Sequence, residues 1–208
     1  MKEFKHLPGL DLIRVFGILV VVFYHYQVET AVRGLCPADF LPAMEPLVQV
    51  AVYTMTLLSG SCLCWQEKSR SWSMKRYLWG RFLAIYPLFW LCFFPIFIYS
   101  DIICGNNEGV APWKLLLSIV GVDGYFQSFT PTFYKIGEWY LGCILFLYAV
   151  FPVLWRMIRR RGVVFAAVGA LFAWLACCFV ENPGQLYPTL IGQLPLFFMG
   201  IFLGGCLP

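Results

Sequence analysis

About six apolar segments divide this chain of 208 residues. They cover approximately residues 10–28, 46–65, 77–99, 138–157, 163–180 and 189–208, with short polar stretches between them. A helix of about 20 apolar residues crosses the hydrocarbon core of a bilayer, where only helices and closed barrels satisfy every backbone polar group. We therefore predict an all-α fold, a polytopic transmembrane helix bundle with about six spans.

The composition supports an integral membrane protein and argues against a nucleic-acid-binding one. The chain is 61% hydrophobic and 12% charged, whereas soluble domains are about 25% charged. Its net charge of +4 comes from short basic clusters beside the apolar segments, a pattern that reflects topology and not a nucleic-acid-binding face. We expect the lipid bilayer as a partner and no nucleic acid.

The basic residues predict the orientation. With the N-terminus in the cytoplasm, three basic residues lie outside (Arg33, Lys114 and Lys135) and ten lie inside, in agreement with the positive-inside rule. The ten are Lys2, Lys5, Lys68, Arg70, Lys75, Arg76, Arg156, Arg159, Arg160 and Arg161. This orientation requires residues 113–136 to cross the membrane zero or two times, which favours an interfacial or re-entrant piece. Since the last apolar run continues to Pro208, we expect residues 1–208 to be one membrane domain that is incomplete at its C-terminus.

The first apolar segment carries an acid, a cation and an imidazole, namely Asp11, Arg14 and His25. Ionisable groups at membrane depth are costly and by default indicate function. Eleven residues bring a helix back to within about 20° of its starting direction, so Arg14 and His25 share one face, roughly 16 Å apart along the axis. Asp11 lies three residues before Arg14 and is close enough to pair with it. A helix that served only as an anchor would need none of the three.

Several short motifs occur in order along the chain. Residues 9–14 read Gly-Leu-Asp-Leu-Ile-Arg, ten residues separate Arg14 from His25, and Ser59-Gly60 lies late in the second segment. Residues 85–90 read Ile-Tyr-Pro-Leu-Phe-Trp, and Glu138-Trp139-Tyr140-Leu141 precedes Phe151-Pro152. In this order the motifs resemble those of the membrane acyltransferase 3 family, over most of the chain. On the residues themselves, Ser59 and Gly60 indicate close helix packing and not a nucleophile.

The resemblance implies transfer of an acyl group, commonly acetyl, from a cytoplasmic thioester donor such as acetyl-CoA to a hydroxyl group. The implied acceptor is a glycan or lipid-linked molecule of the cell envelope, and the implied location is the bacterial cytoplasmic membrane. His25 would be the catalytic base, a role that suits imidazole near neutral pH. Arg14 would be its charged partner, holding donor phosphates or a developing oxyanion. A structural reading remains open for each, as an interfacial histidine and a snorkelling arginine.

Further residues are predicted to handle the two substrates. The family often has two arginines three residues apart before its Ile-Tyr-Pro motif, implicated in donor handling, and here Arg81 keeps the first position while Ala84 occupies the second. We expect Arg81, with Arg76 and Lys75, to bind the donor, although the latter two also fit a role in topology alone. Glu138 and Trp139 are candidates for acceptor binding, and Asp11 for orienting Arg14.

Two other functional classes fit the same residues. In a transporter, the charges in the first segment would line a substrate or proton path. Alternatively, a non-catalytic relative of the family would fit the replacement at Ala84. We expect no metal site, because Cys62 and Cys64 have no second ligand pair, and no tightly bound cofactor.

Overall fold

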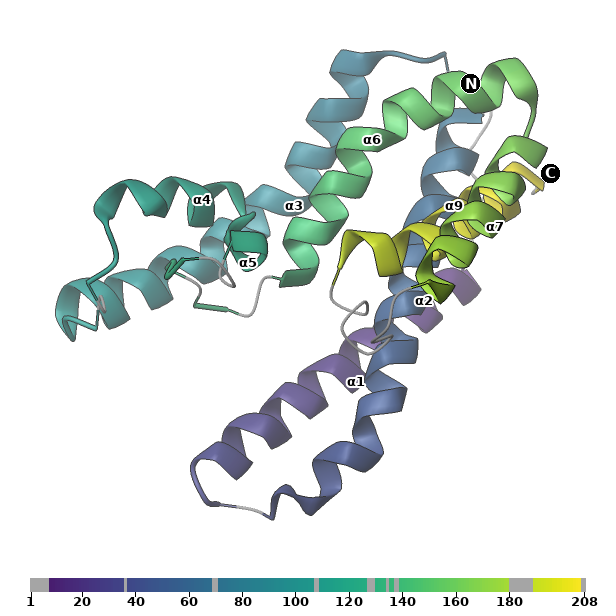
Figure 1. The fold of residues 1–208 in the computed structure, drawn as a ribbon. Coiled ribbons are helices and arrows are strands. Elements are labelled where there is room, and N and C mark those ends of the chain that lie inside the picture. Colours follow the sequence, from purple (N-terminus) through teal and green to yellow (C-terminus); the bar gives the residue numbers. More distant parts are fainter. Residues whose placement is uncertain are drawn as a thin grey trace. The chain divides into compact units, whose positions relative to one another are not determined.

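The computed structural model describes residues 8–35, 37–68, 71–106, 109–126, 130–133, 135–136, 139–179 and 189–206. Within these ranges the regular elements are all helical, which confirms the predicted all-α class (Figure 1). In chain order they are α1 (Pro8–Val32), η1 (Ala38–Phe40), α2 (Leu41–Lys68), α3 (Met74–Phe97), the π-helical turn η2 (Ile98–Ile103), η3 (Pro112–Lys114), α4 (Leu115–Val120), α5 (Asp123–Phe126), α6 (Trp139–Arg161), α7 (Val164–Cys178) and α9 (Leu190–Cys206).

Four of the described helices are long and apolar enough to cross a membrane. They are α1, α2, α6 and the continuous helix formed by α3 and η2, with 25, 28, 23 and 30 residues respectively. The fifth and sixth predicted spans are shorter apolar helices, since α7 has 15 residues and α9 has 17. At about 1.5 Å per residue, α7 rises roughly 22 Å, less than the thickness of the hydrocarbon core.

The chain divides into two compact units, which are described separately. The first unit comprises Met1–Arg70, Met157–Tyr187 and Ile191–Pro208, and therefore holds α1, α2, α7 and almost all of α9. The second comprises Ser71–Arg156 and Pro188–Leu190, and holds α3, the short helices η3, α4 and α5, and most of α6.

In the first unit, α1 and α2 form a helical hairpin (Figure 1). Its core consists of Val20, Val48 and Ala51. Gly17 faces Met55 and Ala51, so the two helices approach closely at a residue without a side chain. This packing fixes which face of α1 turns toward α2.

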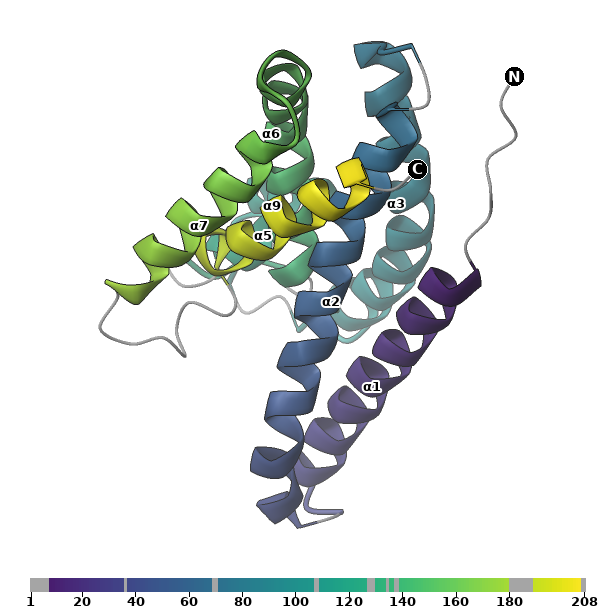
Figure 2. The ribbon, with the colours of Figure 1, turned by 90° about the vertical axis from the view of Figure 1, so that its right-hand side faces the viewer.

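A second close contact joins α2 to α9, which cross in Figure 2. A Cβ atom on Gly60 would meet the carbonyl oxygen of Phe197, and one on Gly200 would meet that of Leu57. The hydroxyl of Ser61 donates a hydrogen bond of 2.9 Å to the Gly200 carbonyl. The close packing predicted for Gly60 is confirmed. The adjacent Ser61 adds a hydrogen bond that joins α2 to α9.

In the second unit, Ser73 is the N-cap residue of α3, and its side chain accepts a hydrogen bond from the Arg76 backbone N–H. This N-terminal cap satisfies a backbone donor that has no partner within the helix. Phe89, Phe93 and Phe133 form a buried core in the second unit.

Residues 113–136 contain only short helices in their described part, and none is long enough to span. The hydroxyl of Tyr86 donates to the Val120 carbonyl at 3.0 Å, and the indole N–H of Trp90 donates to the Ile119 carbonyl at 2.9 Å. These bonds hold the end of α4 against α3. No helix in the described part of residues 113–136 is long enough to cross a membrane, and the interfacial or re-entrant placement of this piece stays a prediction.

Candidate functional site

The guanidinium of Arg14 is held by groups from two helices. Its Nη1 donates to Oδ1 of Asp11 at 3.1 Å, one turn earlier on α1. Its Nη2 donates to Sγ of Cys62 at 2.8 Å, near the end of α2. The side chains of Arg14 and Asp11 are 38% and 44% exposed, so both remain accessible from outside the protein. The predicted pairing of Asp11 with Arg14 is present, and Cys62 adds a partner from the neighbouring helix.

His25 lies eleven residues after Arg14 on the same helix, α1. Its side chain is exposed in the described structure, and its ring contacts that of Tyr24 edge to face at 5.9 Å between centroids. Tyr24 in turn packs against the core shared by α1 and α2. The helix therefore presents an anchored cation and, about 16 Å further along its axis, an accessible imidazole.

The first turns of α3 carry the predicted donor-binding cations. Lys75 is exposed and Arg76 is half-buried. Together with Ser73 and Trp79 they line a surface hollow of about 470 Å³. Two cations and an indole around one hollow favour an anionic ligand with a flat or apolar part.

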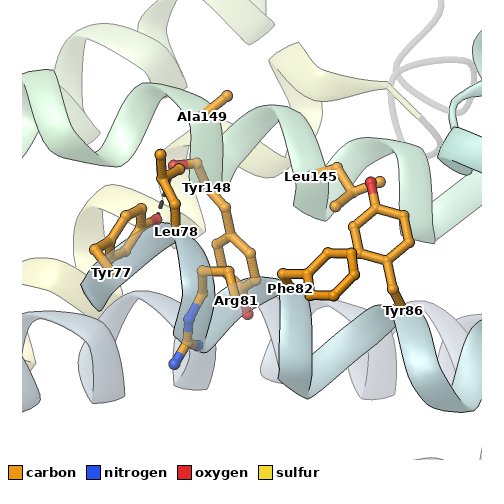
Figure 3. Close-up of a pocket in the computed structure, with 8 residues that line it drawn as sticks. All are labelled: Tyr77, Leu78, Arg81, Phe82, Tyr86, Leu145, Tyr148 and Ala149. Atoms are coloured by element: carbon orange, nitrogen blue, oxygen red, sulfur yellow. Dashed lines mark hydrogen bonds between the residues drawn. The ribbon is translucent and has the colours of Figure 1, made fainter. Parts of the chain in front are cut away.

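Arg81 lies further along α3 beside a narrow groove of about 190 Å³. Its guanidinium stands over the ring of Tyr148 on α6, 5.5 Å from the centroid, in a cation–π contact. Figure 3 shows the groove, with Tyr77, Leu78, Arg81, Phe82 and Tyr86 from α3 and Leu145, Tyr148 and Ala149 from α6. Its surface is almost wholly apolar apart from this cation.

A hydrogen bond and a set of aromatic contacts fix one end of this groove. The hydroxyl of Tyr77 donates to the Tyr148 carbonyl at 2.7 Å (Figure 3). The Tyr77 ring also stacks on Phe151 at 5.5 Å, and Phe151 stacks on Trp155 at 6.1 Å. This bond links α3 to α6 and limits the groove at the side of Tyr77.

The predicted acceptor-binding residues begin α6. Trp139 is half-buried and its backbone lies against Gly124 of α5, while Glu138 lies outside the described residues. Nearby, Tyr125 packs edge to face against Phe146, and burial raises the pKa of the Tyr125 hydroxyl well above its ordinary value. The Tyr125 hydroxyl is itself buried, so of these residues the half-buried Trp139 is the one that an acceptor could contact.

The structure thus places the predicted residues in two sets. Asp11, Arg14 and His25 belong to the first unit, and the cations of α3 belong to the second together with Trp139. The sequence analysis missed Cys62 and Tyr148 as partners of the two arginines. Their contacts join residues far apart in the chain, and neither residue type signals such a role by itself.

Comparison with known proteins identifies the family. A family model described as an acyltransferase domain matches residues 7–205, nearly the whole chain. One similar protein is the acyltransferase MdmB of Streptomyces mycarofaciens, 26% identical over 191 residues, which are 85% of this chain and 47% of that relative. The chain therefore spans about half the length of this curated relative. No solved structure matches the chain.

Proposed function

Because this chain belongs to the membrane acyltransferase 3 family, we propose that it takes part in moving an acyl group from a thioester to a hydroxyl. The donor is cytoplasmic acyl-CoA, with acetyl-CoA the first choice, and the acceptor is a glycan or lipid-linked molecule of the cell envelope. The protein resides in the bacterial cytoplasmic membrane with its N-terminus in the cytoplasm, as its basic residues favour.

The arrangement of α1 is the observation that carries this proposal. Arg14 is anchored by Asp11 and Cys62, whereas His25 is exposed on the same helix. A fixed cation suits the binding of an anionic part of the donor, such as a phosphate. An accessible imidazole suits proton transfer with a substrate.

In the proposed reaction, the Nε2 or Nδ1 atom of His25 takes the proton from the acceptor hydroxyl. The hydroxyl oxygen then attacks the thioester carbonyl carbon, and a carbon–oxygen bond forms as the carbon–sulfur bond breaks. The coenzyme A thiolate leaves and takes the proton from the imidazolium. Arg14, about 16 Å from His25 along the helix axis, would hold a phosphate of the donor away from the reacting carbonyl, and Asp11 orients Arg14.

The start of α3 supplies the proposed donor site. Lys75 and Arg76 would bind the donor phosphates, since both line the hollow of about 470 Å³. Arg81, five residues further along the helix, would meet the part of the donor nearer the thioester. Trp139 would pack against the acceptor and Glu138 would accept hydrogen bonds from its hydroxyl groups.

The test is acyl transfer in membranes that contain the protein. Membranes with and without the chain are incubated with [14C]acetyl-CoA and envelope glycans, and label bound covalently to glycan or lipid-linked material is counted. We expect label only when the chain is present. If the membranes instead move an unmodified substrate and form no labelled product, the transporter class replaces this proposal.

A further inference from the structure

Four arginines near the end of α6 have no role in the proposed reaction. They are Arg156, Arg159, Arg160 and Arg161. All four side chains are exposed, and none of them forms a hydrogen bond or an ion pair with another residue that the structure describes. The sequence contains no aspartate or glutamate from residue 139 to residue 180. This end of α6 therefore carries a concentrated positive charge without acidic neighbours along the chain.

Three of these arginines lie on one face of α6. At about 100° per residue, Arg159 and Arg160 lie on either side of Arg156 and within about 60° of it. Arg161 lies about 140° from Arg156, on another side of the helix. Because all four residues belong to one continuous helix, their relative positions follow from helix geometry alone.

The face of the three arginines continues toward the start of α6 as an exposed apolar stripe. Its members are Phe146, Val150 and Val153, and each is exposed. Phe146, Val153 and Arg160 follow one another at intervals of seven residues, and each interval turns a helix by only about 20°. From Phe146 to Arg156 the helix rises about 15 Å, half of the roughly 30 Å hydrocarbon core. The stripe thus matches the length of the acyl chains in one leaflet.

Two general explanations account for part of this arrangement. Cations at the C-terminal end of a helix interact favourably with its dipole, and cations beside a span follow the positive-inside rule. Both explanations need positive charge at this end of α6, but neither requires three arginines in line with an exposed apolar stripe. An anionic phospholipid matches both parts, because guanidinium groups bind phosphate bidentately and acyl chains pack on apolar side chains.

We propose that this face of α6 is a binding site for an anionic phospholipid of the bilayer. Arg156, Arg159 and Arg160 contact the headgroup phosphate, and the acyl chains lie along Val153 and Phe146. Basic clusters at the end of a spanning helix recognise anionic lipids through the same combination of charge and position. The inference goes beyond acyl transfer and requires only that α6 lies in a bilayer.

Lipid binding by the purified full chain tests the proposal. The chain in neutral detergent is titrated with phosphatidylglycerol or with phosphatidylcholine, and native mass spectrometry gives the affinity for each lipid. We expect tighter binding of phosphatidylglycerol. Arg156→Gln and Arg160→Gln should each weaken it about fivefold and together about thirtyfold, because one basic residue near the headgroups contributes about fivefold in affinity. The affinity for phosphatidylcholine should stay unchanged.

Two further variants separate the site from charge and from folding. Arg161→Gln is the matched control, because it removes the same charge one residue further along α6 but from another side of the helix. It should leave the affinity for phosphatidylglycerol unchanged. Arg156→Lys combined with Arg160→Lys keeps both charges and should retain most of the affinity, which shows that the glutamine variants lose a charge contact and not their fold.

Four results would overturn the inference. They are equal affinities for the two lipids, equal weakening by Arg160→Gln and Arg161→Gln, unchanged binding in the double glutamine variant, and a lysine variant as weak as the glutamine one. Inorganic phosphate is added as a competitor to identify the source of the anion. We expect it to leave lipid binding unchanged, and displacement of phosphatidylglycerol by an equal concentration of phosphate would assign the arginines to a soluble anion instead.

Discussion

The Nη2 atom of Arg14 lies 2.8 Å from Sγ of Cys62, 48 residues away in sequence. Cys62 itself follows Ser61, whose hydroxyl is bonded to the Gly200 carbonyl of α9. The position of the arginine on α1 is thus linked through α2 to the packing of a third helix. In the proposed function this arrangement would hold the cation in place for an anionic part of the donor.

The contact predicts that Cys62→Leu lowers kcat/KM for acyl transfer about tenfold, because a hydrogen bond to a charged group contributes about 1.5–3 kcal/mol. Cys62→Ser should retain most activity, since its hydroxyl can also accept from Arg14. The exposed Cys92 of α3 provides the control, and Cys92→Leu should have no effect. Equal rates for Cys62→Leu and the unaltered chain would remove Cys62 from the positioning of Arg14.

The crossing of α2 and α9 predicts strong sensitivity at Gly200. A Cβ atom there would meet the Leu57 carbonyl, so Gly200→Ala must push the helices apart, at a cost of about 1–3 kcal/mol. Gly80 of α3 has open space around it, and Gly80→Ala is the matched control. Apparent thermal stability in detergent should fall for Gly200→Ala alone, and an equal shift for both would contradict the packing.

Hydropathy and charge were sufficient to predict the class and the main helices. The predicted segments at 10–28 and 77–99 lie within α1 and within the continuous helix formed by α3 and η2, because a bilayer-length apolar run has few alternatives to a helix. The second segment begins earlier than predicted, at Leu41, with Pro46 inside the helix near its start. Pro46 is the sixth residue of α2, beyond the first turn, and membrane helices accept a proline there because neighbouring groups satisfy the freed backbone carbonyl.

The tertiary contacts could not be predicted in the same way. The fold of residues 113–126 depends on bonds from Tyr86 and Trp90 to backbone carbonyls, and such bonds have no sequence signature. The pairing of α2 with α9 joins segments about 140 residues apart, and Gly60 indicated close packing without indicating a partner. At the candidate site, spacing predicted the pair of Asp11 and Arg14 because it is local, whereas Cys62 and Tyr148 come from other helices.

A buried ion pair in the second unit should contribute strongly to stability. Nζ of Lys135 lies 3.1 Å from Oδ1 of Asp101, whose side chain is 3% exposed. Lys135→Met would leave the carboxylate without this cation, at a cost of about 3–5 kcal/mol. Adding Asp101→Asn should recover part of the loss in apparent thermal stability. If the double variant is as unstable as the sum of the single variants, the two groups do not act as a pair.

The buried contact between α2 and α9 provides a second coupling test. The Thr56 hydroxyl donates to Oε1 of Gln193 at 2.7 Å, and both side chains are fully buried. Thr56→Val and Gln193→Leu should each cost about 1–3 kcal/mol, because each removes one partner of a buried hydrogen bond. Thermal denaturation of the double variant should show a smaller loss than the sum, and strict additivity would argue against the bond.

The most direct measurement for the proposed function compares acetyl transfer by His25→Ala with transfer by Val22→Ala. Both variants shorten an exposed side chain of α1, but only the first removes a group that can carry a proton. Loss of general-base catalysis should lower the rate about 10²–10⁴-fold. The account predicts this loss for His25→Ala at equal expression, with Val22→Ala close to the unaltered chain. Full transfer activity in His25→Ala would contradict it.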